Sequence, residues 1–111
     1  MEIDIRRVLF SLRRSGLRLF VGDDGVVHGK MRNGKPMPIE ARPLVDDLRR
    51  LNDKAVELMS REVTEVIDQT VLHERLNDWM MIADGEIELA GPIFYDPKTG
   101  TAEVIYRRAA E

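Results

Sequence analysis

The chain has 111 residues, of which 43% are hydrophobic and 33% are charged. This length suits one domain with a modest core, and the composition excludes a disordered tail and a membrane protein. Cysteine is absent, which excludes disulfides, thiolate metal ligands and thiol nucleophiles and fits a reducing compartment. The N-terminus carries acids and lacks the long apolar run of a secretory signal, so we predict a cytoplasmic location.

Charge is distributed unevenly along the chain. Residues 1–50 hold eleven Lys or Arg and seven Asp or Glu, whereas residues 51–111 hold six and thirteen. The basic first half and acidic second half suit head-to-tail association, or a basic end that meets an acidic partner. Uneven decoration of a solvated surface is the alternative.

The first predicted element is a helix over residues 3–14. Its apolar residues recur at the spacing of one helix face: Ile5, Val8, Leu9 and Leu12. We expect Ser15 and Gly16 to end this helix, with Gly16 in the left-handed conformation.

The opposite side of this helix carries arginines around two apolar residues. At 100° per residue this arginine face comprises Arg6, Arg7, Arg13 and Arg14, with Ile3 and Phe10 between them. Arginines beside an aromatic ring are typical of interface hot spots, and arginines also bind nucleic-acid phosphates. The alternative is a solvated charged face whose Phe10 packs against another element of the same chain.

A β-hairpin is predicted next. Residues 17–21 and 26–28 have β-prone sequences, and residues 22–25 form a turn that tolerates positive φ. Asn33-Gly34 is a second turn signal, after which we expect either a third short strand or a plain loop. Pro36 and Pro38 would confine such a strand to a sheet edge, because proline cannot donate a hydrogen bond.

Residues 44–83 contain neither glycine nor proline and are predicted to be helical. One arc of the helix surface collects Leu44, Val45, Leu48, Leu51, Ala55, Leu58, Met59, Val63 and Val66. A second apolar group, rotated away from the first, comprises Leu72, Leu76, Trp79 and Met80. We therefore predict two helices, or one helix with a break near residues 68–70.

The last third is predicted to form a C-terminal hairpin. Residues 87–90, 93–95 and 101–106 have strand patterns, residues 96–100 form a turn, and residues 107–111 are expected to fray. The predicted fold is α+β: N-terminal helix, β-hairpin, two helices or one long broken helix, and C-terminal β-hairpin. The two hairpins are candidates to join in one sheet beneath the helices.

Residues 1–60 carry a helix that ends in Gly16-Leu17, a hairpin with Asp23-Asp24-Gly25 at its tip, and a Lys54-Ala55-Val56-Glu57-Leu58 stretch. This order resembles the TubC-type N-terminal docking domain of nonribosomal peptide synthetase and polyketide synthase subunits. The resemblance implies an α+β domain that often dimerises and accepts a partner's peptide by strand addition. It implies that Val26, Val27, His28 and Lys30 form the receiving surface.

The chain departs from this family pattern at two places. The stretch from residue 29 to residue 43 is longer than the pattern expects, and residues 62–111 follow where the family continues into a synthase. We predict a single domain over residues 1–111, divided into a docking-like module (1–60) and a helical and hairpin extension (61–111).

The sequence offers no catalytic constellation. His28 and His73 are the only histidines, and His73-Glu74 lacks the second histidine of a zinc site. No phosphate-binding loop and no recognisable acid–base pair with a nucleophile is present. We therefore predict no enzyme activity, no cofactor and no metal.

The sequence therefore predicts a non-catalytic docking or adaptor module, homodimeric, that binds a peptide segment or subunit by its hairpin edge. The predicted partner-binding residues are Arg6, Phe10, Arg13, Arg14, Val26, His28 and Lys30. The alternative is a phage- or plasmid-type accessory protein that acts on nucleic acid or on a nucleic-acid enzyme. The arginine face supports this alternative, and the acidic total charge opposes it.

Overall fold

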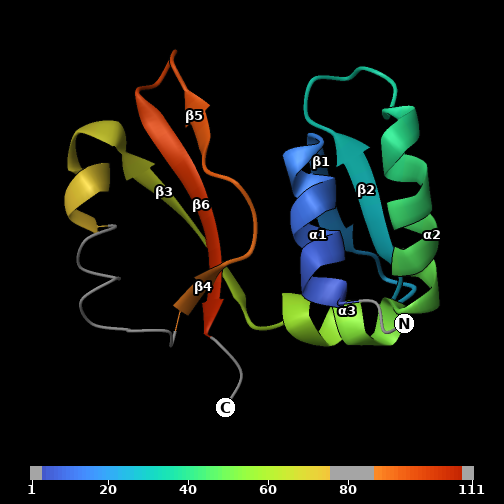
Figure 1. Cartoon of the computed structure of the whole chain (residues 1–111). Helices are drawn as coiled ribbons and strands as arrows, with labels where there is room; N and C mark the ends of the chain where they lie inside the picture. Colours follow the sequence, from blue (N-terminus) through green and yellow to red (C-terminus); the bar gives the residue numbers. More distant parts are fainter. Residues whose placement is uncertain (1–3, 76–86, 109–111) are drawn as a thin grey trace. The chain divides into compact units, whose positions relative to one another are not determined.

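The computed structural model describes residues 4–75 and 87–108 (Figure 1). The chain divides into two compact units, Met1–Ser60 and Arg61–Glu111, which we call the N-terminal and C-terminal units. Their boundary falls at the end of the docking-like module. Helices and antiparallel strands occur in both units, which confirms the predicted α+β class. Within the described residues, no helix has the length and apolar character needed to cross a membrane.

The N-terminal unit begins with α1 (Ile5–Arg14), which lies within the predicted range 3–14 and ends at the predicted residue. Asp4 caps the helix by accepting a hydrogen bond from the backbone N–H of Arg6. Gly16 follows the C-cap at φ 101°, the left-handed conformation that glycine adopts without a steric cost. The predicted apolar face is buried and begins the core of this unit.

Strands β1 (Leu17–Val21) and β2 (Val27–Met31) form the predicted hairpin. Their antiparallel register places Phe20 opposite His28 and Val21 opposite Val27. After the turn at Asn33-Gly34 the chain runs as a loop into the short helix η1 (Ile39–Ala41), so the loop alternative is correct.

Two short helices complete the N-terminal unit, α2 (Arg42–Arg50) and α3 (Asn52–Met59), which are separated at Leu51. Leu48 from α2 and Ala55 from α3 join the α1 residues and the inward hairpin residues in one core. The predicted helical segment over residues 44–83 is therefore correct in its first part, but its break lies at Leu51.

The prediction of a helix is wrong for residues 62–68. These residues form strand β3 (Glu62–Asp68), which pairs along its whole length with β6 (Thr101–Arg108). Four of its seven residues are β-branched (Val63, Thr64, Val66 and Ile67), and such side chains fit a pleated strand better than a helix. Val63 and Val66 continue the helical spacing of the apolar arc that begins at Leu44, but they are 45% and 68% exposed.

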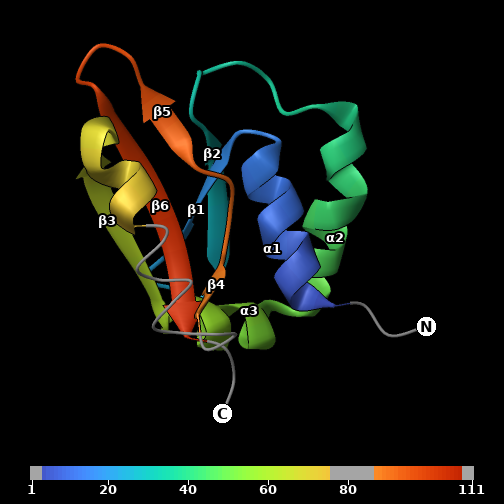
Figure 2. The same cartoon turned by 60° about the vertical axis from the view of Figure 1, so that its left-hand side comes forward.

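The C-terminal unit is a four-stranded antiparallel sheet, in which β6 pairs with β3, with β4 (Ile87–Leu89) and with β5 (Phe94–Asp96). Residues 69–75 are helical and cover one face of the sheet (Figure 2). Leu72 of this helix packs on Ile67, Ala102 and Val104. The predicted C-terminal hairpin is confirmed as β5 and β6.

Two further expectations are corrected. Strand β6 extends to Arg108, so residues 107 and 108 are paired rather than frayed, because β4 and β3 both bond to this end of the strand. The two predicted hairpins lie in separate sheets, β1-β2 and the four-stranded sheet, because β3 supplies the neighbour that β6 needs. Leu76, Trp79 and Met80 lie outside the described residues.

Candidate functional site

The hairpin has two faces with different environments. Successive side chains of a strand point to opposite sides, so the register assigns every residue to a face. The inward face includes the buried Leu17 and Val27, which belong to the core. The other face, which we call the hairpin outer face, consists of Arg18, Phe20, Val26, His28 and Lys30, all exposed.

The hairpin outer face combines an aromatic ring with basic groups. Phe20 is 48% exposed, and its ring centroid lies 5.7 Å from that of His28 on the opposite strand. Arg18 and Lys30 are opposite each other in the next cross-strand pair on this face. Three of the seven predicted contact residues, Val26, His28 and Lys30, are thus brought together here. Phe20 and Arg18 were not predicted as contacts, although strand alternation places them on this face.

The hairpin tip fixes the position of His28. Its Nε2 lies 3.1 and 3.2 Å from the two carboxylate oxygens of Asp24, which also accepts a hydrogen bond from the backbone N–H of Val26. The Val26 N–H and then the His28 ring lower the pKa of Asp24 below its ordinary value. A Cβ on Gly22 would lie 2.7 Å from Asp24 Oδ1 and 2.8 Å from the His28 ring, so glycine leaves room for this pair.

The outer edge of β2 is engaged at one end by a side chain from α3. Two backbone hydrogen bonds, from Gly22 N–H to the Val26 carbonyl and from Arg32 N–H to the Gly16 carbonyl, identify hydrogen-bonded pairs at the two ends of the hairpin. Such pairs alternate along an antiparallel ladder, so the backbone groups of Val27, Gly29 and Met31 point away from β1. Asn52 Oδ1 accepts from Val27 N–H at 2.9 Å, and Asn52 Nδ2 donates to the Gly25 carbonyl at 2.9 Å. The Asn52 side chain therefore already occupies the Val27 N–H, which an added strand would need at this point.

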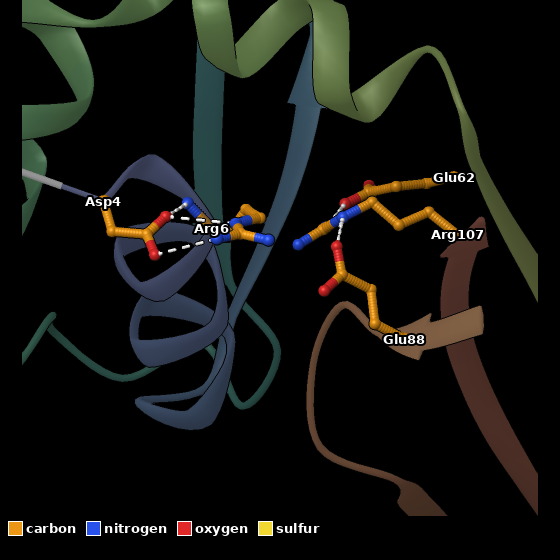
Figure 3. Close-up of polar contacts among 5 residues, drawn as sticks. All are labelled: Asp4, Arg6, Glu62, Glu88 and Arg107. Atoms are coloured by element: carbon orange, nitrogen blue, oxygen red, sulfur yellow. Dashed lines mark hydrogen bonds and ion pairs between the residues drawn. The ribbon is translucent and has the colours of Figure 1, made fainter. Parts of the chain in front are cut away.

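The predicted arginine face of α1 is not uniformly exposed. Arg6 and Arg14 are exposed, Phe10 is half-buried, and Arg13 is only 3% exposed. Arg6 Nε and Nη2 each donate to the Asp4 carboxylate at 3.3 Å (Figure 3). The Arg6 side chain is the main cause that lowers the pKa of Asp4. The four helix residues predicted as contacts thus lie in three different environments.

The C-terminal unit carries two polar clusters that the sequence did not reveal. Arg107 on β6 bonds to Glu88 Oε1 at 2.8 Å and to Glu62 Oε2 at 3.1 Å (Figure 3). Both carboxylates stand directly opposite Arg107 in the register, one on each neighbouring strand. Buried arginines require such partners, so this ionic row is a structural link across three strands. Only the strand pairing brings its members together.

The second cluster joins the helix at residues 69–75 to the sheet. Glu65 accepts a hydrogen bond from Tyr106 Oη at 2.7 Å and from Arg75 Nη2 at 2.8 Å. The Tyr106 bond, followed by the Arg75 bond, lowers the pKa of Glu65, and the same Glu65 bond raises the pKa of Tyr106. Both shifts follow from the same contact, in which the tyrosine donates and the ionised glutamate accepts.

A hollow of about 420 Å³ lies beside this helix, lined by Gln69, Leu72, His73, Tyr95 and Pro97. Tyr95, one of its lining residues, stands opposite Ala102 in the register, and Ala102 stands opposite Ile67 on the other side of β6. In the part of the chain that the structure describes, no group of three or more His, Asp or Glu side chains could hold a metal ion.

Comparisons of the chain with protein-family models, with curated proteins and with solved structures gave no match.

Proposed function

We propose that this chain is a non-catalytic docking or adaptor module whose hairpin binds a peptide segment of a partner protein. The observation that carries the proposal is the hairpin outer face, which places an exposed aromatic ring among basic groups on a hairpin anchored in the core. Aromatic and cationic residues on a rigid support are the usual anchors of protein interfaces. A segment with an apolar anchor and acidic neighbours complements this face.

The hairpin edge offers backbone hydrogen bonds to the same segment. Beyond the Asn52 amide, the backbone groups of Gly29 and Met31 point outward from β2. A peptide that adds as a strand pairs with these two residues, or displaces Asn52 and also pairs with Val27. Strand addition would supply affinity, and the hairpin outer face would select the sequence.

The test begins with selection of short displayed peptides on the immobilised protein, followed by fluorescence anisotropy with the selected peptide. We expect Phe20→Ala and Lys30→Glu each to weaken binding about tenfold or more, because they remove the anchor and the attraction. Lys35→Glu makes the same charge change outside the hairpin outer face and serves as the matched control. Equal affinities for all three variants would refute the proposed surface.

The role of the edge is tested with Asn52→Ala. If the peptide adds a strand that displaces Asn52, this variant binds it more tightly, because a competitor for Val27 N–H has been removed. If binding leaves Asn52 in place, through the side-chain face alone or through Gly29 and Met31, the affinity of the folded variant equals that of the unaltered protein. The two results separate strand addition that displaces Asn52 from binding that does not.

We further propose that the module is a homodimer. Light scattering at low and high salt measures this directly. A dimer that persists at high salt supports apolar association, and a monomer at all concentrations removes this part of the proposal.

A second candidate function is nucleic-acid binding, favoured by the exposed Arg6 and Arg14 on α1. Phosphate contacts would make the affinity fall steeply as salt rises. Titration of labelled duplex DNA and single-stranded RNA at several salt concentrations distinguishes the candidates. Peptide binding should show a much weaker salt dependence than a contact with several phosphates.

A further inference from the structure

Strand β3 is the end strand of its sheet within the described residues, since it pairs with β6 and with no other described strand. The bond from Gln69 N–H to the Gly100 carbonyl identifies the hydrogen-bonded pairs of this ladder. Hydrogen-bonded and non-hydrogen-bonded pairs alternate along an antiparallel ladder. Counting back from Gln69 in steps of two, the backbone groups of Val63, Glu65 and Ile67 therefore point to β6. Those of Thr64 and Val66 point away from it.

The outer edge of β3 also exposes apolar side chains. Val66 is 68% exposed and Val63 is 45% exposed, on opposite faces of the strand. Edge strands invite pairing with another chain unless they are short, bulged, covered, or blocked by proline or charged side chains. Strand β3 spans seven residues and contains neither proline nor glycine.

The charge of the strand decides what kind of segment fits. Strand β3 carries three acidic residues, Glu62, Glu65 and Asp68, and no basic residue. Glu62 and Glu65 already bind arginines of the same unit, so Asp68 decides the preference. A second copy of β3 would bring no basic side chain to Asp68, whereas a basic segment would place a cation beside it. Opposite charges stabilise a cross-strand pair and like charges destabilise it.

The three acids differ in what they can offer. Glu62 bonds to Arg107 and Glu65 bonds to Arg75, whereas Asp68 is exposed at the end of the strand. Asp68 Oδ1 accepts from the backbone N–H and hydroxyl of Thr70, and these bonds lower the pKa of Asp68, so it stays ionised. Val66 and Asp68 are two residues apart and therefore share one face of the strand.

We propose that the edge of β3 is a second docking site, which takes an extended basic segment of another protein as an added strand. The segment has a β-branched residue beside Val66 and a Lys or Arg two positions away beside Asp68. Backbone bonds to Thr64 and Val66 hold it, and the side-chain spacing selects it. With a docking surface in each unit, the chain would connect two partners. The β3 proposal stands without the hairpin proposal, because it uses different residues.

The probe is a capped synthetic peptide, Thr-Lys-Thr-Val-Thr-Lys-Thr, which reads the same in both directions and so suits parallel and antiparallel pairing. Its matched control replaces both lysines by glutamates, and a second control carries an N-methyl group on the valine amide. We expect the lysine peptide to bind about tenfold or more tightly than either control in anisotropy titrations of the full chain.

Amide hydrogen exchange gives an internal control. The N–H groups of Val63 and Glu65 are bonded to β6 already, so the peptide should leave their protection unchanged. The outward N–H groups of Thr64 and Val66 should become protected only when the peptide binds.

A proline pair tests the edge within the protein. Val66→Pro removes an outward N–H and should leave the ladder to β6 in place, as proline is tolerated on an edge. Ile67→Pro removes an N–H bonded to β6 and should disrupt the sheet. We expect the Val66→Pro protein to keep its circular dichroism spectrum and lose about tenfold in peptide affinity.

Equal binding of the lysine and glutamate peptides would overturn the proposal. So would unchanged affinity in a folded Val66→Pro protein. Protection of Thr64 and Val66 amides that rises with protein concentration, in the absence of peptide, would assign the edge to a second copy and also overturn it.

Discussion

Removal of the Asn52 side chain measures how firmly α3 is fastened to the hairpin. The two bonds of its amide, to Val27 N–H and to the Gly25 carbonyl, are each 2.9 Å long. One neutral hydrogen bond contributes roughly 0.5–1.5 kcal/mol net. Alanine's better helix propensity offsets at most about 0.5 kcal/mol. We therefore expect Asn52→Ala to lower the free energy of unfolding by about 1–2 kcal/mol.

The assay is urea denaturation followed by circular dichroism, combined with amide exchange at Val27. Asn52→Asp is the graded comparison, because a carboxylate still accepts from Val27 N–H but cannot donate to Gly25. It should lose about half as much stability as the alanine variant. Lys54→Ala changes an exposed residue of the same helix and serves as the control.

An Asn52→Ala protein as stable as the control variant, with Val27 N–H still slow to exchange, would refute this role of Asn52. That result would mean that another group satisfies Val27, and that Asn52 contributes neither to stability nor to protection of the β2 edge.

Three further changes test the packing and the polar clusters. Leu12→Ala, at a fully buried position of α1, should cost about 2–5 kcal/mol and lower the denaturation midpoint of the N-terminal unit, whereas Arg14→Ala on the exposed side should change it little. Arg107→Met should cost about 3 kcal/mol in chemical denaturation because it removes the buried cation that both Glu62 and Glu88 bind, and an unaltered midpoint would show that the ionic row does not support the sheet. Glu65 has a lowered pKa, so the stability it contributes is present above its ordinary value of 4.5 and is lost as pH falls through the folded-state value. Glu65→Gln should therefore flatten the loss of stability in acid, measured by thermal denaturation across that pH range, and a curve parallel to that of the unaltered protein would contradict the assignment.

Local signals determined the N-terminal unit. The apolar face of α1, the glycine after it and the turn between β1 and β2 each specify a conformation over a few residues, and each lies where the sequence predicted it. Given the hairpin, alternation alone would also have assigned Phe20 to the same face as His28. The missed signal was therefore present in the sequence, because strand faces follow from a period of two.

The helix-to-strand error at residues 62–68 has a different origin. Val63 and Val66 are three residues apart, a spacing that continues a helical stripe as readily as it fits a strand with two exposed faces. The deciding factor is β6, whose residues lie more than thirty positions further along the chain and satisfy the β3 backbone. Partners at such sequence separations leave no mark on local periodicity.

The sequence by itself determined the α+β class, the first helix and hairpin, and the basic and aromatic character of the proposed contact surface. Tertiary structure alone decided that β3 is an edge strand, that Arg107 stands between Glu62 and Glu88, and that Asn52 reaches the edge of β2. The physical reason is common to all three. Hydrogen-bond pairing between distant strands, and between a helix and a strand, depends on register and position in space rather than on the residues adjacent in the chain.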